Sequence, residues 1–213
     1  MPDSETIYWL FLAGREPRMM VVMSDVVEGL GEQFDVLPPL AAEDFVCALC
    51  RLDFSRVTIE QVLEAITMLP RTVREVVAAV PENALRLRPA PQLWSITEYV
   101  CHLRDVYATY TIRLHRAVTE DEPVLEAMFN DLRAQRFRYN RLDVPAVLQE
   151  LDANAAGFTA EAATVPDRDW GRCVTRRPGE SRTARWLARQ VMHEGTHHLG
   201  DIRRTLAAVT CAT

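Results

Sequence analysis

The sequence predicts an all-α protein, an antiparallel four-helix bundle preceded by a small N-terminal extension that is partly β. Three observations support this prediction. Apolar residues recur at every third or fourth position from residue 58 onward, which is the period of an amphipathic helix. Helix-start signals stand at the beginnings of these patterns. Polar loops that contain Pro and Gly separate the patterns.

The first 56 residues have a different pattern from the rest of the chain. Ile7–Ala13 and Met19–Val27 are short apolar runs separated by a segment with Gly and Pro, which favours two strands joined by a turn. A short helix is predicted over Ala41–Leu49. We therefore divide the chain into an N-terminal extension at 1–56 and a helical bundle at 57–213.

The first two long helices have the same kind of start. Thr58 with Gln61, and Ser95 with Glu98, have the spacing of a capping box, in which two side chains and two backbone N–H groups pair reciprocally. Pro70 lies inside the first pattern, which predicts a kink or two stacked helices. The apolar positions of the second helix are Ile96, Val100, Leu103, Tyr107, Tyr110 and Leu114.

Two further long helices complete the predicted bundle. Between residues 119 and 143 the sequence predicts a long loop with a short helix around Leu125–Tyr139. Pro145 suits the first position of the third long helix. Thr183 is predicted to cap the last helix, which runs to about Ala208.

The composition excludes several classes of function. The chain of 213 residues carries 24 basic and 30 acidic residues, a net charge of −6 that argues against nucleic-acid binding through phosphates. It contains no Lys, which excludes Schiff-base chemistry on lysine and P-loop phosphate binding. No apolar run reaches the length of a membrane span, and no positively charged segment precedes the first one. Five cysteines, an odd number, favour reduced thiols in the cytoplasm.

Three of the five histidines fall within six residues of the predicted last helix. His193 and His197 spell H-E-x-x-H, the zinc metalloprotease signature, although Arg203 stands where the extended signature has a third histidine. Glu194 and His198 form a second pair four residues apart, and either pair could bind one metal from one helix face.

The phase of the helix favours the second pair. Glu194 and His198 fall inside the apolar stripe of this helix, whereas His193 and His197 fall roughly 100° from its centre. A buried Glu and His are costly unless they are compensated, and a metal ion would compensate them. A buried Glu–His pair without metal is the alternative. The stripe consists of Leu187, Val191, Ile202 and Leu206.

A metal at this pair needs a ligand from another helix, and the periodicity indicates one only weakly. His102 lies at the flank of the apolar stripe of the second helix, and His115 projects toward its polar side. Cys47-Ala48-Leu49-Cys50 is a C-x-x-C, but the sequence shows no second such pair and no βαβ context for redox chemistry. We therefore expect these two residues to be ordinary thiols, and Cys101 to be a packing residue.

Two segments carry a resemblance to a known family. Pro89–Asp105 and His193–Ile202 resemble the second-helix and last-helix motifs of the DinB/YfiT-like metalloenzyme superfamily, which is related to mycothiol-dependent maleylpyruvate isomerases. The resemblance covers residues 58–208. Arg51-Leu52-Asp53-Phe54 follows Cys50 where some relatives have Gly-Phe-Asp, and Phe129-Asn130-Asp131 replaces a more aromatic, acidic stretch.

The resemblance implies a metal site and a reaction class. It implies a divalent metal, zinc or nickel, held by His102, Glu194 and His198, in a bundle that forms homodimers. Arg104, Asp105 and Asp201 are expected to support these ligands.

The expected function is a metal-dependent enzyme, a thiol-cofactor-dependent S-transferase or isomerase that acts on a small molecule. The resemblance implies a low-molecular-weight thiol cofactor, mycothiol or bacillithiol, and no partner membrane or nucleic acid is expected. Two alternatives remain open. One is a non-catalytic metal-binding or small-molecule-binding stress protein. The other is a zincin-type metallohydrolase that uses the H-E-x-x-H of residues 193–197.

Overall fold

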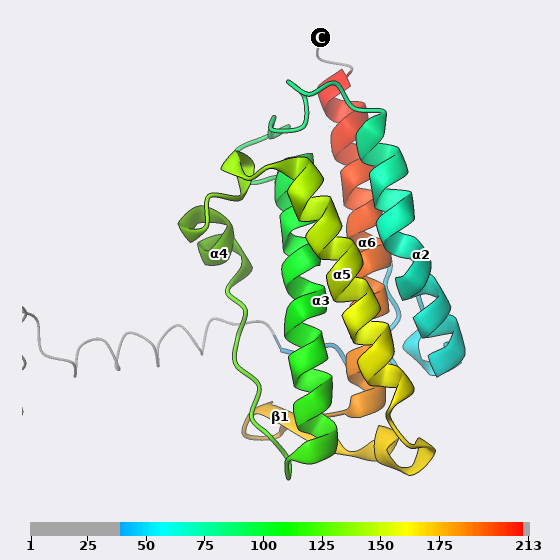
Figure 1. Cartoon of the computed structure of the whole chain (residues 1–213). Coiled ribbons are helices and arrows are strands. Elements are labelled where there is room, and N and C mark those ends of the chain that lie inside the picture. The colour runs from blue at the N-terminus through cyan, green and yellow to red at the C-terminus, as the bar shows by residue number, and fades with distance from the viewer. Residues whose placement is uncertain (1–38, 211–213) are drawn as a thin grey trace, which may run out of the picture. The chain divides into compact units, whose positions relative to one another are not determined.

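The computed structural model describes residues 39–210, and Leu40 onward belongs to one compact unit. The predicted strands at 7–13 and 19–27 lie outside the described residues. Four long helices dominate the fold (Figure 1). They are α2 (Ile59–Ala78), α3 (Ile96–Thr119), α5 (Val144–Ala163) and α6 (Ala184–Thr210). None of the helices in residues 39–210 is long and apolar enough to cross a membrane.

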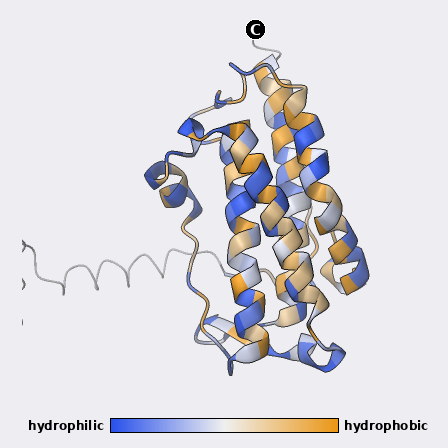
Figure 2. Ribbon diagram, viewed as in Figure 1, coloured by the Kyte–Doolittle hydropathy of each residue, from blue (hydrophilic) through white to orange (hydrophobic). Residues whose placement is uncertain are grey.

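The four long helices form a four-helix bundle, which confirms the predicted fold class. Figure 1 shows α2 and α6 running in one direction and α3 and α5 in the other. Both α2 and α3 pack against α5 and α6, so each long helix has one parallel and one antiparallel neighbour. Each helix carries polar as well as apolar residues (Figure 2). The largest fully buried side chains include Phe54, Ile66, Tyr107, Phe158 and Trp186.

The predicted helix starts agree with the structure. Thr58 and Ser95 each accept a hydrogen bond from the third residue of their helix, and both capping boxes are complete. The Asp143 carboxylate caps α5 by accepting a hydrogen bond from the Ala146 N–H. Helix α5 therefore begins at Val144, one residue before the predicted start at Pro145. The Thr183 hydroxyl accepts from the Trp186 N–H at the start of α6. Local side-chain spacing was therefore sufficient to locate these starts.

Two sequence predictions need correction. Helix α2 continues through Pro70 as one element, not as two stacked helices. Pro70 is buried, so its packing offsets the backbone hydrogen bond that it cannot donate. The predicted helix over 41–49 does not form. Residues there adopt turns, and Val46 instead pairs with Asp53 in an isolated antiparallel bridge.

The parallel pair α3 and α5 requires a long connection. Residues 120–143 return along the bundle from the end of α3 to the start of α5, and they include the short helix α4 (Asn130–Arg136) and the 3-10 turn η2 (Tyr139–Arg141). The predicted short helix around 125–139 is thus present but shorter. Such a connection lets two consecutive long helices run in the same direction.

A small hairpin before α6 was not predicted. Strands β1 (Cys173–Arg177) and β2 (Glu180–Thr183) pair antiparallel, with Cys173 opposite Thr183. Gly179 has φ +78° in the turn, a conformation that Gly adopts without strain. The 3-10 turn η3 (Asp167–Gly171) precedes the hairpin. The turn signal at Pro178-Gly179 was visible in the sequence, but the flanking strands are short and polar.

Residues 40–56 pack on the bundle and do not stand apart from it. Phe54, in the 3-10 turn η1 (Phe54–Arg56), is fully buried in the core. The Glu43 carboxylate accepts hydrogen bonds from the backbone N–H and the hydroxyl of Thr183. The compact unit therefore begins at Leu40, well before the boundary at 57 that the change of periodicity indicated.

Candidate metal centre

Three side chains of types that can bind a metal meet inside the bundle, and they come from two helices. His102 projects from α3, and Glu194 and His198 project from one face of α6. The Glu194 Oε2 lies 3.2 Å from His102 Nε2 and 3.2 Å from His198 Nε2. The two imidazole rings approach edge to face, with centroids 4.8 Å apart. The structure thus brings together the three residues that the sequence analysis proposed as ligands.

This donor set fits a divalent metal ion. Two ligand atoms bound to one zinc at about 2.0–2.1 Å with tetrahedral angles lie roughly 3.3 Å apart. The carboxylate oxygen stands at nearly this separation from both imidazole nitrogens. Two imidazoles and a carboxylate are donors that zinc and other borderline metals accept. The three side chains leave further coordination positions free for a small molecule.

The charges at this site are set by mutual contacts. Burial raises the pKa of Glu194, but hydrogen bonds with His102 and His198 outweigh burial and hold its pKa well below the usual range. Burial lowers the pKa of His198, but hydrogen bonds with Asp201 and Glu194 prevail and raise its pKa to about 9. The glutamate is therefore an anion inside the bundle, a suitable charge for a cation to neutralise.

Two side chains on α6 orient these donors. The Gln190 Nε2 donates to Glu194 Oε1 at 2.7 Å, which leaves Oε2 directed at the imidazoles. The His198 Nδ1 lies 2.8 Å from the Asp201 carboxylate, which accepts a hydrogen bond from it. The other ring nitrogen, Nε2, is then directed at Glu194. Holding the second ring nitrogen in this way is how proteins fix the tautomer and direction of a metal-binding histidine.

Aromatic rings line the same site. The Trp94 ring lies 5.1 Å from that of His102, and the Tyr99 ring lies 5.4 Å from that of His198. The Trp94 Nε1 donates to the Asp131 carboxylate at 2.9 Å. Asp131 therefore fixes Trp94 beside His102.

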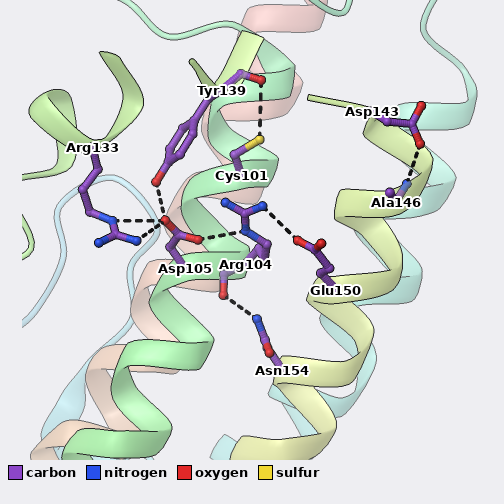
Figure 3. A network of polar contacts seen from close by, with 9 residues as sticks. All are labelled: Cys101, Arg104, Asp105, Arg133, Tyr139, Asp143, Ala146, Glu150 and Asn154. Carbon is purple, nitrogen blue, oxygen red and sulfur yellow. Dashed lines mark hydrogen bonds and ion pairs between the residues drawn. The ribbon is translucent and has the colours of Figure 1, made fainter. Parts of the chain in front are cut away.

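Arg104 and Asp105, which the sequence analysis expected to support the metal ligands, instead join a different network (Figure 3). Asp105 accepts hydrogen bonds from Tyr139, Arg133 and Arg104. Arg104 also pairs with Glu150 of α5 at 2.9 Å. The network connects α3 to α5 and to the crossover, the connection at residues 120–143. Of the three predicted supporting residues, only Asp201 contacts a donor histidine.

The other singled-out residues of α3 lie away from the donors. The His115 Nδ1 pairs with Glu161 at 3.0 Å on an exposed surface. Cys101 is fully buried, and burial raises the pKa of its thiol to about 12. Both agree with the interpretation of His115 as a surface residue and Cys101 as a packing residue.

A second group of atoms that could hold a metal ion lies on another face of α6. Cys47, Cys50, His193 and His197 place one donor atom each within 4.8 Å of one another. The sequence does not connect the C-x-x-C with the two histidines, because they are about 145 positions away. The helical phase was the one available signal for the histidine pair, since two histidines at i and i+4 that avoid the core stripe must face another part of the chain or solvent.

The H-E-x-x-H sequence is thereby divided between two groups. His193 and His197 lie with the cysteines, while the intervening Glu194 lies with His102 and His198. In the zincin arrangement the glutamate acts at a metal held by those same two histidines. The geometry of this helix does not match that arrangement.

Comparisons with known proteins agree with the fold. The sequence model described as the DinB superfamily matches residues 65–202, so the chain belongs to this superfamily. The match spans α2 to the last turns of α6 and includes His102, Glu194 and His198. A comparison with curated proteins gives no match.

Two solved proteins share the fold at low sequence identity. YfiT from Bacillus subtilis, described as a probable metal-dependent hydrolase with an unusual four-helix bundle topology, has a TM-score of 0.65 and 16% identity, over 80% of this chain and 93% of that chain. A mycothiol-dependent maleylpyruvate isomerase has a TM-score of 0.57 and 14% identity, over 70% of this chain and 62% of that chain. A mutant of this isomerase is similarly related, with a TM-score of 0.58 and 13% identity.

Proposed function

We propose that this protein is a divalent-metal-dependent enzyme that joins a low-molecular-weight thiol to a small substrate, or isomerises a substrate with its help. The observation that carries the metal-dependent part is the meeting of His102, Glu194 and His198, with Oε2 3.2 Å from both imidazole nitrogens. The reaction class rests on the fold shared with a mycothiol-dependent isomerase.

The three residues would bind the ion, and neighbouring side chains would fix their positions. His102 would contribute Nε2 from α3, with its ring fixed by Trp94. Glu194 and His198 would contribute Oε2 and Nε2 from α6, fixed by Gln190 and Asp201. The chemistry that a divalent ion supplies there is Lewis-acid activation, which lowers the pKa of a coordinated thiol or water.

Access to the site suits a small molecule. The His102 side chain is 3% exposed, whereas those of Glu194 and His198 are 20% and 19% exposed, so the donors can be reached from one side. A peptide substrate usually pairs with an exposed sheet edge, and the sheet of the described residues is one short hairpin. The arrangement supports a small-molecule substrate over an extended peptide.

The metal part is tested by metal analysis of the full chain purified without chelator. We expect Glu194→Gln and His198→Ala each to lose one molar equivalent of zinc or nickel relative to the wild type. His115→Ala, a change at an exposed histidine of α3, should keep the full content. Unchanged metal content in both ligand variants would contradict the proposal.

The thiol part is tested with the metal-loaded protein, mycothiol and a panel of electrophiles. We expect conjugation or isomerisation that Glu194→Gln abolishes, and a rise in melting temperature with the thiol alone. Metal binding without either effect would favour a non-catalytic metal-binding or small-molecule-binding protein. Cleavage of a peptide panel that depends on Glu194, without thiol turnover, would favour the hydrolase alternative.

A further inference from the structure

We propose that Cys47, Cys50, His193 and His197 form a second metal site, a closed zinc site that fixes residues 40–56 to α6. This site is separate from the donors of the proposed enzyme site and does not depend on the proposed function. It would join two parts of the chain that lie about 145 residues apart in the sequence.

The four donor atoms lie close together, and one pair stands at the separation expected for two ligands of one zinc ion. All four lie within 4.8 Å of one another. The Cys47 Sγ is 3.5 Å from His197 Nδ1. A zinc bound to sulfur at about 2.3 Å and to nitrogen at about 2.0–2.1 Å places these two atoms roughly 3.6 Å apart. The observed separation therefore equals that of two ligands of one zinc ion.

His193 provides an independent observation. Both of its ring nitrogens are buried, and neither has a hydrogen-bond partner among residues 39–210. Leaving a buried polar group unpaired costs free energy, so such an atom requires an explanation. Phe45 and Phe54 pack edge to face on the ring, with centroids 5.4 and 5.9 Å away, and hold it beside His197. A metal ion bound to one nitrogen would account for this placement.

The backbone around the two cysteines is shaped to present both sulfurs to one side. The Arg51 N–H donates to the Cys47 carbonyl at 2.9 Å, so the chain turns back on itself between the two cysteines. Arg51 adopts φ +66°, which turns the chain directly after Cys50. The Cys47 N–H then donates to the Leu52 carbonyl at 2.9 Å and closes the turn. This turn brings the two sulfurs to the side of α6 that carries His193 and His197.

The charge and the number of ligands indicate zinc in a structural role. On binding, the ion would displace one proton from each thiol to solvent, and two thiolates with two neutral imidazoles would balance the charge of Zn²⁺. A set of two sulfurs and two nitrogens in tetrahedral arrangement favours zinc. Four protein ligands leave no open position, which is the property of structural sites.

Cobalt substitution of the full chain tests this site. Dialysed wild-type protein should bind two equivalents of Co²⁺ and show a thiolate-to-cobalt charge-transfer band. Cys50→Ser and His193→Gln should each lose one equivalent and lose or shift this band. Cys173→Ser, a change at a cysteine outside the group, should alter neither. His102→Ala should lose the other equivalent and keep the band, which separates this site from the proposed enzyme site.

Zinc protection of the thiols tests the same site without any substitution. In wild-type protein, added Zn²⁺ should slow alkylation of Cys47 and Cys50 at least tenfold, as mapped by mass spectrometry, and leave Cys173 unchanged. Equal alkylation rates with and without Zn²⁺ would overturn the proposal, as would a wild-type cobalt spectrum that lacks the thiolate band.

Discussion

Gly195 lies where helix α6 approaches α2 and α3 closely. A Cβ atom there would lie 2.7 Å from Leu69 Cδ2 of α2 and 2.7 Å from the Tyr107 hydroxyl of α3. Tyr107 is fully buried, so its ring has no free space to move into. The absence of a side chain at Gly195 thus lets α6 place Glu194 and His198 beside α3.

We expect Gly195→Ala to destabilise the protein by about 1–3 kcal/mol, the usual cost of overpacking a core. Urea denaturation measures this change. Gly157→Ala is the matched control, because Gly157 lies exposed on α5 and its added Cβ would meet nothing within 4 Å. That control should gain about 0.5–1 kcal/mol from helix propensity. Equal stability of the two variants would show that the close approach is unimportant.

The Asp105 carboxylate makes stability depend on pH in the acid range. Burial raises its pKa, but hydrogen bonds from Tyr139 and Arg133 and the charge of Arg104 outweigh burial and lower its pKa. Because its pKa is lower in the folded state, the Asp105 carboxylate stabilises the fold at pH values above its unfolded-state pKa of about 3.9. This stabilisation disappears as the pH falls through the folded-state pKa.

We therefore expect Asp105→Asn to cost about 1–3 kcal/mol at pH 7, since three donors lose a charged acceptor. The difference from the wild type should shrink below about pH 4. Denaturation curves at neutral and acid pH measure both effects. Asp152→Asn removes a carboxylate from an exposed pair with Arg74 and should change stability by less than about 1 kcal/mol. A constant difference at all pH values would refute this origin.

At single residues, the sequence predicted donors that share a helix but not those that meet through the fold. Glu194 and His198 follow from the period of one helix, and the structure places them together. The meeting of His193 with Cys47 depends on the path of residues 40–56 over α6, which no local pattern specifies. Long-range contacts of this kind become visible only when the chain is folded.

Among the elements, local signals located the helices and failed for the short irregular segments. Thr58 and Ser95 form the predicted capping boxes because a cap depends on residues only three positions apart. The hairpin at 173–183 and the turns at 41–49 depend on contacts with the bundle, such as those of Glu43 with Thr183. Their sequences alone carry too little periodicity to predict them.

Residues 40–56 are expected to stabilise the bundle through Phe54. This side chain is 0% exposed and belongs to the core, so Phe54→Ala should cost about 3–5 kcal/mol. Thermal and urea denaturation measure the loss. Phe137→Ala is the matched control, because Phe137 is 51% exposed after α4, and it should cost less than about 1 kcal/mol. A small effect at Phe54 would mean that the segment contributes little to folding.

In the whole molecule, the class of fold was predictable and its connectivity was not. Four amphipathic patterns of suitable length predict a four-helix bundle. The directions of the helices depend on residues 120–143, which pass along the bundle and let α3 and α5 run parallel. The sequence of this crossover shows its length but not its path.

Removal of divalent metal should lower the stability of the whole chain. A ligand at 100 times its Kd stabilises the folded state by about 2.7 kcal/mol. We expect a chelator to lower the melting temperature and added Zn²⁺ to restore it, as measured by calorimetry. The double variant Cys50→Ser, Glu194→Gln should show no response to either. A chelator response retained in that variant would place the ion elsewhere.

Asp201 gives the two groups of donors a common neighbour. Its Oδ2 lies 2.8 Å from His198 Nδ1 and 3.6 Å from His197 Nε2, so one carboxylate faces a histidine of each group. A metal ion bound to either imidazole would change the interaction of that imidazole with Asp201, and with it the interaction between Asp201 and the other imidazole. By thermodynamic reciprocity, occupancy of the first group must alter the affinity of the second by the same factor as the reverse. Stepwise zinc titrations should therefore be cooperative in the wild type, and independent in Asp201→Asn.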